Sequence, residues 1–138
     1  MSAAPERAIA AAIFDAVRSD LAVQAVLGAP ARFYDEPPPD VTFPYATLGR
    51  METRAADAAD ASALDHVVTL HVWSRYGGRA EALDIISALR GALHNKSLTV
   101  QDRRLTLLYA TFSDAFRLGD GRTTQGVLRL RAVTELAM

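Results

Sequence analysis

The segment LDHVVTLHVWS, residues 64–74, decides the fold class of this chain. Its apolar residues alternate with other types, which predicts a β-strand because successive side chains of a strand point to opposite faces. One face would carry Val68, Leu70 and Val72, and the other Val67, Thr69, His71 and Trp73. Since both faces carry apolar residues, we expect both to be at least partly covered.

A helical pattern precedes this strand. Pro5 and Glu6 suit a first helical turn, because Pro lacks a donor that would be unpaired there and an acid complements the helix dipole. Apolar residues then recur at every fourth position, which predicts one buried stripe formed by Ile9, Ile13, Val17 and Leu21.

Two further helical segments are expected. A short turn covers residues 21–27 and ends where Gly28 is followed by Pro30. Residues 79–94 carry Leu83, Ile86 and Leu89 at helical spacing, so this helix should lie across a sheet.

Three other strands are predicted around these helices. They cover residues 45–51, 105–116 and 127–134, with a further short one at 98–100. The prolines of residues 28–44 exclude regular helix and predict an extended connection. Residues 53–62 alternate Ala with Asp and predict a mobile loop or hairpin extension.

The order of elements is therefore α-β-β-α-β-β. It predicts an α+β fold in which an antiparallel sheet of about four strands has helices packed against it. With 138 residues, half of them hydrophobic, we expect one domain spanning residues 1–138.

Composition narrows the functional classes. Fifteen basic and sixteen acidic residues give a net charge of -1, too balanced for general DNA binding. Cysteine is absent, which removes disulfides, thiol nucleophiles and thiolate zinc sites. No signal-peptide core or membrane-spanning run is predicted, so we expect a product that stays soluble in the cell that makes it.

No catalytic motif stands out. The three histidines fall on separate predicted elements, and a packed or interface imidazole is favoured over a catalytic one for His71. The acids around the proline triplet and in the Ala/Asp segment lack calcium-loop spacing, so solvated charge is the favoured interpretation. We therefore expect no catalytic residue, no metal and no cofactor.

Two groups of residues suggest contacts between subunits. His71, Trp73, Arg129 and Arg131 lie on strand faces opposite the apolar ones, and Trp and Arg are enriched at interfaces. The complete set of candidate interface residues is His71, Trp73, Arg75, Arg129, Arg131, Asp35, Pro37 and Pro38. The alternative is a second sheet face covered by helices, with ordinary surface arginines.

Several stretches, taken in order, resemble one family over nearly the whole chain. They are residues 21–28 (LAVQAVLG), 32–35 (RFYD) with Pro37 and Pro38, 43–49 (FPYATLG), 69–74 (TLHVWS) and 126–131 (GVLRLR). Together they resemble the tail-completion or tail-terminator proteins of long-tailed phages, prophages and gene transfer agents.

The resemblance implies a structural virion protein. Such proteins form homohexameric rings at the head-proximal end of the tail, where they terminate the tail tube and join it to a neck or head-completion (stopper) protein. The resemblance implies no catalytic residues. It implies a protein made in the bacterial cytoplasm and located in the particle, and does not choose between phage, prophage and gene transfer agent.

DNA would pass through such a ring without specific binding. A neutral or negative wall suits this role, because Lys and Arg contacts to phosphate would hold the DNA in place. Asp57, Asp60 and Asp65 lie in or beside the Ala/Asp segment, and we expect them to face the lumen or a neighbouring ring. The competing classes are a small cytosolic α+β enzyme or ligand-binding domain and an interaction module unrelated to virions.

Overall fold

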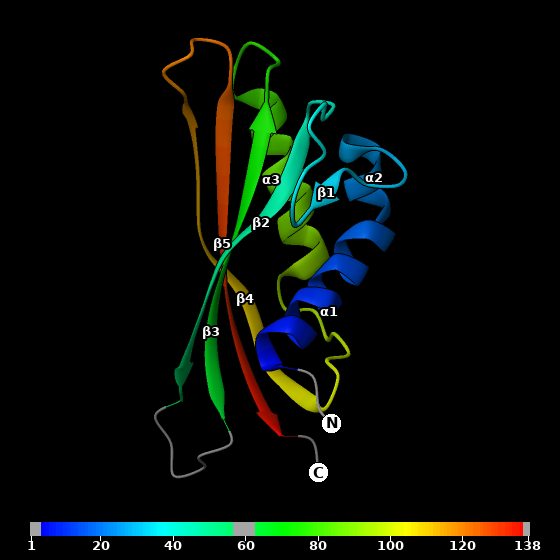
Figure 1. Ribbon diagram of the computed structural model, residues 1–138, viewed down its shortest axis with the longest axis vertical. Coiled ribbons are helices and arrows are strands. Elements are labelled where there is room, and N and C mark those ends of the chain that lie inside the picture. Colours follow the sequence, from blue (N-terminus) through cyan, green and yellow to red (C-terminus); the bar gives the residue numbers. More distant parts are fainter. Residues whose placement is uncertain (1–3, 57–62, 137–138) are drawn as a thin grey trace.

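In the computed structural model, which describes residues 4–56 and 63–136, the strand at residues 64–74 lies in the middle of a five-stranded sheet. The strands follow the order β1-β2-β3-β5-β4 across the sheet (Figure 1). Their bounds are β1 (Phe33–Tyr34), β2 (Tyr45–Ala55), β3 (Leu64–Ser74), β4 (Arg103–Arg117) and β5 (Thr124–Leu136).

The predicted α+β class is confirmed, but the sheet is mixed. The strands β2, β3, β5 and β4 pair antiparallel, whereas β1 pairs with β2 in parallel. The four-strand expectation missed β1 because two residues inside a proline-rich connection are too few to show an alternating pattern.

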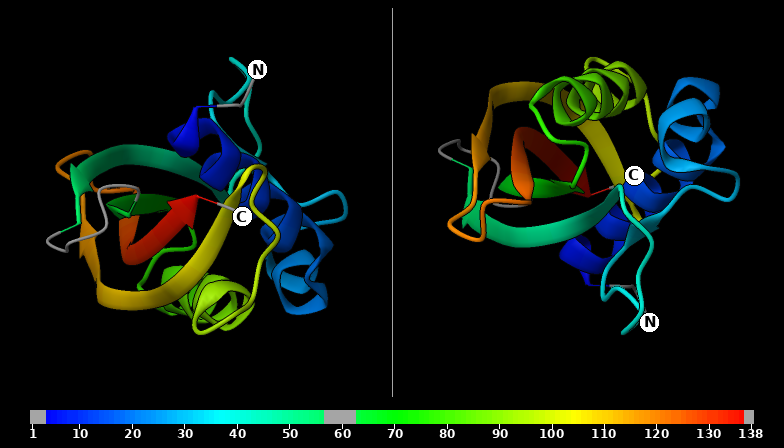
Figure 2. Two further views of the ribbon diagram at one scale, coloured as in Figure 1. Left: turned by 90° about the horizontal axis from the view of Figure 1, so that it is seen from below. Right: turned by 90° about the horizontal axis from the view of Figure 1, so that it is seen from above.

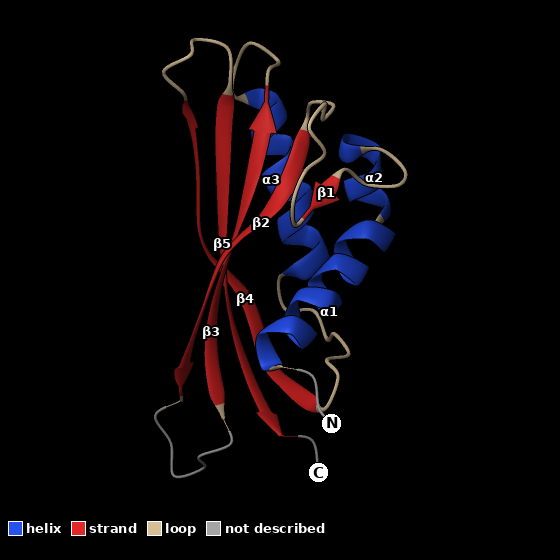
Figure 3. Cartoon of the chain, viewed as in Figure 1, coloured by secondary structure: helices blue, strands red, loops and turns tan. Residues whose placement is uncertain are grey.

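Three helices pack on one face of this sheet: α1 (Pro5–Ser19), α2 (Leu21–Leu27) and α3 (Ala80–Leu93) (Figure 3). The covered face is read from burial, because every second residue of β3 from His66 to Ser74 and of β5 from Thr124 to Thr134 is buried. The opposite face has no helix upon it in the described part of the chain. The residues of β3 on that face are nevertheless half-buried, so both faces of this strand are partly covered, as predicted.

The stripe of α1 is buried as predicted except at its end. Ile9, Ile13 and Val17 are almost fully buried, but Leu21 is 79% exposed. The carboxylate of Asp20 accepts a hydrogen bond of 3.0 Å from the backbone N–H of Val23. This cap begins a new helix at Leu21, so the four-residue spacing does not continue across the break.

The strands differ from expectation at their ends. Residues 53–55 belong to β2 and extend its hairpin with β3, which is the second of the two predicted alternatives, while residues 57–62 lie outside the described residues. Residues 98–100 form no strand, only one bridge between Val100 and Arg103. The long strands are strongly twisted and cross one another in projection (Figure 1), and register shifts in β2 and β4 favour such twist.

The close approach of α3 to β5 depends on Gly126. A Cβ atom at this position would lie 2.9 Å from Cδ1 of Ile86 and 3.1 Å from Cβ of Val72. Neither atom can move easily, because Ile86 and Val72 are buried in the core. Only glycine fits between the helix and the sheet.

A polar cluster interrupts the covered face around His66, which is 1% exposed. Its Nδ1 lies 3.0 Å from the hydroxyl of Thr53, and its Nε2 lies 2.9 Å from the hydroxyl of Thr134, which also accepts from Nε of Arg103 at 2.7 Å. The pKa of the Glu6 carboxyl is lowered by a hydrogen bond from its own backbone and by one from Thr53.

A neutral imidazole satisfies this cluster. In the tautomer with a proton on Nδ1, the hydrogen bonds form one chain. Arg103 donates to the Thr134 hydroxyl, which donates to Nε2 of His66. Nδ1–H of His66 donates to the Thr53 hydroxyl, which donates to the Glu6 carboxylate, so every group has a partner. Burial is the main cause of a lowered pKa for His66. The charge of Arg103 adds to the effect, while Glu6 and Asp65 oppose it.

Replacing Gly126 by Ala should destabilise the fold by ~1–3 kcal/mol, because the added methyl group overpacks the contact with α3. The matched control is Gly91→Ala in α3, where a Cβ meets nothing within 4 Å. That substitution should stabilise the helix by ~0.5–1 kcal/mol. Chemical denaturation measures both, and equal midpoints for the two variants would contradict the packing argument.

The lowered pKa of His66 predicts a loss of stability in acid. The unfolded chain binds a proton near pH ~6.5, before the folded protein does, so the free energy of unfolding should fall as pH decreases below that value. The variant His66→Gln should show a weaker pH dependence between pH ~7.5 and ~5.5. The pH dependence of the free energy of unfolding should be compared with that of the variant His71→Gln, because burial also lowers the pKa of His71. An unchanged slope in His66→Gln would exclude this role.

Candidate functional site

The surface available for function is the face of the sheet opposite the helices, here called the open face. Strand register assigns its residues, since partners paired across strands lie on the same face. It consists of Tyr45, Thr47, Glu52, Arg54, Asp65, Val67, Thr69, His71, Trp73, Arg104, Leu107, Tyr109, Phe112, Asp114, Phe116, Gln125, Val127, Arg129, Arg131, Val133 and Glu135.

Aromatic residues gather where β2 begins and β3 ends. The rings of Tyr45 and Trp73 stack with centroids 6.2 Å apart, and Nε1 of Trp73 donates to the hydroxyl of Thr47 at 3.3 Å. Phe43 packs edge-on against Tyr45, and the guanidinium of Arg75 lies 4.1 Å from the centroid of the Phe43 ring. Burial raises the pKa of Tyr45. Two predicted interface residues, Trp73 and Arg75, thus belong to a preformed aromatic patch.

His71 is held inside the subunit. A Cβ at Gly49 would lie 2.5 Å from the His71 ring, so the imidazole sits directly over the β2 backbone. The amide nitrogen of Gln125 donates to Nδ1 of His71 at 3.0 Å. Burial lowers the pKa of His71, which favours the neutral ring. These contacts agree with the packed imidazole favoured from the sequence.

Arg131 forms the strongest polar contact on the open face. Its guanidinium donates twice to the carboxylate of Asp65, from Nε at 3.0 Å and from Nη2 at 2.8 Å, and Nη1 donates to the hydroxyl of Tyr109 at 3.2 Å. The hydrogen bonds from Arg131 lower the pKa of Asp65, and the same pair raises the pKa of Arg131.

This pair changes the expectation for the predicted lumen acids. Asp65 lies in β3 and its charge is matched by Arg131, so it does not project freely from a loop. Asp57 and Asp60 lie outside the described residues.

Exposed apolar side chains follow the edge strand β4. Phe112 is 46% exposed, and Leu107 and Phe116 are each 37% exposed. The guanidinium of Arg129 lies 4.9 Å from the centroid of the Phe112 ring. Arg129 is itself exposed and makes no ion pair within the described residues, so this end of the open face combines aromatic and cationic groups.

A regular alternation through residues 105–116 predicts Phe112 on the same face as Leu108 and Ala110, but the structure places it on the open face. The register shifts at residues 106 and 111, where the hydroxyl of Thr106 donates to the carbonyl of Val133 and that of Thr111 donates to the carbonyl of Arg129. Each bulge moves the following side chains to the other face. In the sequence, these two bulges are indicated by Thr106 and Thr111, which interrupt the alternation of apolar residues.

His94 has a structural role at the free edge of β4. The backbone N–H of Ala110 donates to Nδ1 of His94 at 3.0 Å, and the N–H of Asn95 donates to the carbonyl of Leu108 at 2.8 Å. The end of α3 therefore covers the middle of this edge. Beyond it, the N–H of Ala115 is capped by the carboxylate of Asp114.

The remaining predicted interface residues lie at the opposite edge of the sheet. Asp35, Pro37 and Pro38 belong to the connection between β1 and β2, which extends from the body in both views of Figure 2. Its base is fixed by Arg32, whose Nε donates to the carbonyl of Pro44 at 2.8 Å. The candidate interface residues therefore fall into two groups, one on or directly beside the open face and one on this connection.

Within residues 4–56 and 63–136, the three histidines lie on separate elements or faces. Among the residues that the structure describes, no three His, Asp or Glu side chains gather to hold a metal. His66 lies on the covered face, His71 on the open face and His94 after α3. A hollow of about 300 Å³ between α2 and α3 is lined by Ala25, Val26, Tyr76, Ala80, Glu81 and Asp84. No helix within the described ranges has the length and apolar character needed to cross a membrane.

Comparison with known proteins identifies the family. The family model described as "Tail completion protein gp17" matches residues 11–135. A chain from the virion of a native gene transfer agent particle is 27% identical with a TM-score of 0.86, covering 97% of this chain and 99% of that one. The bacteriophage SPP1 gp17 protein has a TM-score of 0.59 at 21% identity, covering 91% of this chain and 88% of that one. No curated protein sequence matches.

The matched region contains most of α1, the whole of α2 and α3, and all or nearly all of each strand. A likeness at 21% identity shows the shared fold, while the family model covers most of the chain. The chain therefore belongs to the tail-completion protein family and is a structural component of a virion tail, not an enzyme.

Proposed function

We propose that this protein forms a homohexameric ring at the head-proximal end of a phage or gene-transfer-agent tail. There it ends the tail tube and joins it to the neck or head-completion protein. The observation that carries the proposal is the full-length likeness to a chain of an assembled gene transfer agent virion. The tube protein, the neck protein and further copies of this chain are the proposed partners.

The open face supplies a suitable subunit contact. Exposed aromatic side chains next to arginines are typical of the energetically important centre of an interface. The aromatic patch and the Arg131–Asp65 pair are already formed within the subunit, so little side-chain ordering is needed on assembly. A specific contact should bury more than ~1,000 Å² in total.

A ring of this kind lets DNA pass without binding it. The net charge of -1 provides little attraction for a polyanion. We propose that Asp57 and Asp60, with Asp65 beside them, face the lumen or a neighbouring ring. Because Arg131 matches the charge of Asp65, the other two acids would provide most of the repulsion.

The open-face contact is tested by two substitutions of equally exposed apolar residues. Phe112→Asp changes a side chain that is 46% exposed on the open face, and Leu83→Asp changes one that is 49% exposed on α3. Neither should alter monomer stability much, since both sites are half in water. Phe112→Asp should abolish tail completion and lower DNA delivery, while Leu83→Asp should leave subunit rings intact. The proposal fails if the two variants assemble equally well.

The lumen proposal is tested by replacing Asp57 and Asp60 with Arg. Added positive charge should hold DNA in the channel, so particles should assemble normally but deliver less DNA. Delivery per assembled particle is the quantity to measure, and delivery should recover partly at higher salt because phosphate contacts are screened. Normal delivery by the double variant would exclude a lumen position for these acids.

A further inference from the structure

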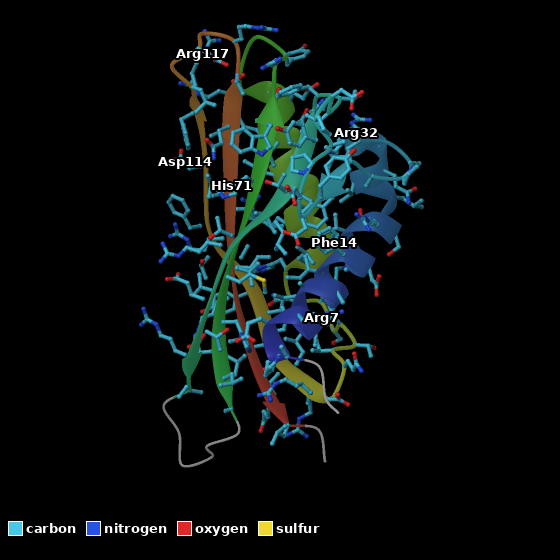
Figure 4. All side chains as sticks on the ribbon, viewed as in Figure 1. Arg7, Phe14, Arg32, His71, Asp114 and Arg117 are labelled. Atoms are coloured by element: carbon cyan, nitrogen blue, oxygen red, sulfur yellow. The ribbon has the colours of Figure 1, made fainter. Side chains whose placement is uncertain are left out.

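Two exposed surfaces of opposite charge lie at opposite edges of the sheet. One is the connection after β1, and the other is the end of the β4–β5 hairpin, where Phe112, Phe116 and Arg129 lie on the open face, Arg117 ends β4 beside the covered face and Arg122 lies in the turn. Figure 4 shows this separation, with Arg32 at the base of the connection on one side and Asp114 and Arg117 along the β4 edge on the other.

The first surface, here called the acidic arm, comprises residues 35–40 with the sequence DEPPPD. Its three carboxylates are exposed, and none makes an ion pair or side-chain hydrogen bond within the described residues. Three consecutive prolines restrict the backbone, which bends at residues 35–36 and turns at residues 39–40, so the arm loses little freedom on binding.

The second surface, here called the cationic aromatic end, contains Phe112, Phe116, Arg117, Arg122 and Arg129, all exposed. The Arg129 guanidinium stacks on Phe112, and Arg117 makes only a long hydrogen bond of 3.4 Å to the carbonyl of Gly77. The guanidinium groups of these arginines can therefore donate hydrogen bonds to carboxylates of a partner.

Two acids lie within this second surface, but both are engaged. Asp114 caps the N–H of Ala115, and Asp120 accepts hydrogen bonds from the hydroxyl and N–H of Thr123 and from the N–H of Arg122. Those hydrogen bonds, the Thr123 hydroxyl first, lower the pKa of Asp120 to about 2. Three arginines against these two acids leave the surface positive, whereas the arm carries three uncompensated negative charges.

We propose that the acidic arm of one subunit binds the cationic aromatic end of the next. Proline rings pack on the faces of Phe112 and Phe116, as polyproline segments do on aromatic-lined surfaces. The carboxylates of Asp35, Glu36 and Asp40 pair with the guanidinium groups of Arg117, Arg122 and Arg129, forming charge-assisted hydrogen bonds.

The positions of the two surfaces make the contact heterologous. Each subunit offers its arm at the β1–β2 edge and receives a neighbouring arm at the β4 edge. A heterologous contact generates a ring when its rotation closes, whereas a two-fold contact at either edge of the sheet would bring two arms or two cationic ends together. The inference rests on the proposed ring and names the surfaces that hold it together.

The natural chain has no cysteine, so introduced cysteines report this contact directly. Particles would carry Pro38→Cys together with Phe116→Cys and be treated with a short bismaleimide. A denaturing gel should show a ladder of covalent oligomers up to six subunits. Neither single variant should give more than traces, and the control pair Pro38→Cys with Leu83→Cys should give none, because Leu83 lies on the helical side.

A charge exchange provides the second measurement. Glu36→Arg and Arg129→Glu should each reduce DNA delivery by about tenfold or more, since each leaves a charge facing its like. The combined variant should recover most of that loss. Recovery is not expected from a substitution that merely unfolds the subunit.

The outcomes separate this inference from the proposed function. A ring seen by imaging, with cross-links only to tube or neck proteins or with no rescue by charge exchange, would overturn the arm contact and leave the ring intact. The absence of any ring of this protein would overturn both.

Discussion

The structure depends on the long antiparallel pairing of β3 with β5. This pairing joins residues 64–74 with residues 134–124 without a register shift, so one face is buried from His66 to Ser74 in β3 and from Thr124 to Thr134 in β5. A one-residue slip would turn the buried set of apolar side chains to solvent, which fixes the register strongly. The three helices lie on the side of that buried face, with α3 directly against β3 and β5, and the other face is left for contacts outside the subunit.

Small residues and polar pairs allow the other elements to pack around a sheet that has one covered face and one open face. Gly126 lets α3 approach the covered face, and Gly49 lets His71 lie flat on the open one. The His66 cluster joins α1, β2, β4 and β5 through hydrogen bonds, while the Arg131–Asp65 pair fixes charges across β3 and β5. The open face is therefore rigid before assembly, as expected for a subunit whose partners read a preformed surface.

The sequence indicated the parts of the fold that have strong local periodicity. The bounds of β3 were predicted without error, and those of α3 and β5 within a few residues, because the strands alternate regularly and the helix has regular helical spacing. The register of β4 was missed because two bulges interrupt it, and β1 because it is two residues long. The sequence-based set of candidate interface residues lacked Phe112 and Phe116. These two residues could be recognised as exposed only once the register of β4 was known. The His66 cluster draws on four distant segments and leaves no sequence pattern.

The central claim is that the open face is covered by neighbouring copies in a ring at the end of the tail. Electron cryomicroscopy of assembled particles, at a resolution that shows side chains, tests it most directly. The account predicts six copies between the tail tube and the neck, with the Phe112 and Arg129 side chains of each copy buried against the next. A different copy number, or an open face exposed to solvent in the assembled particle, would contradict it.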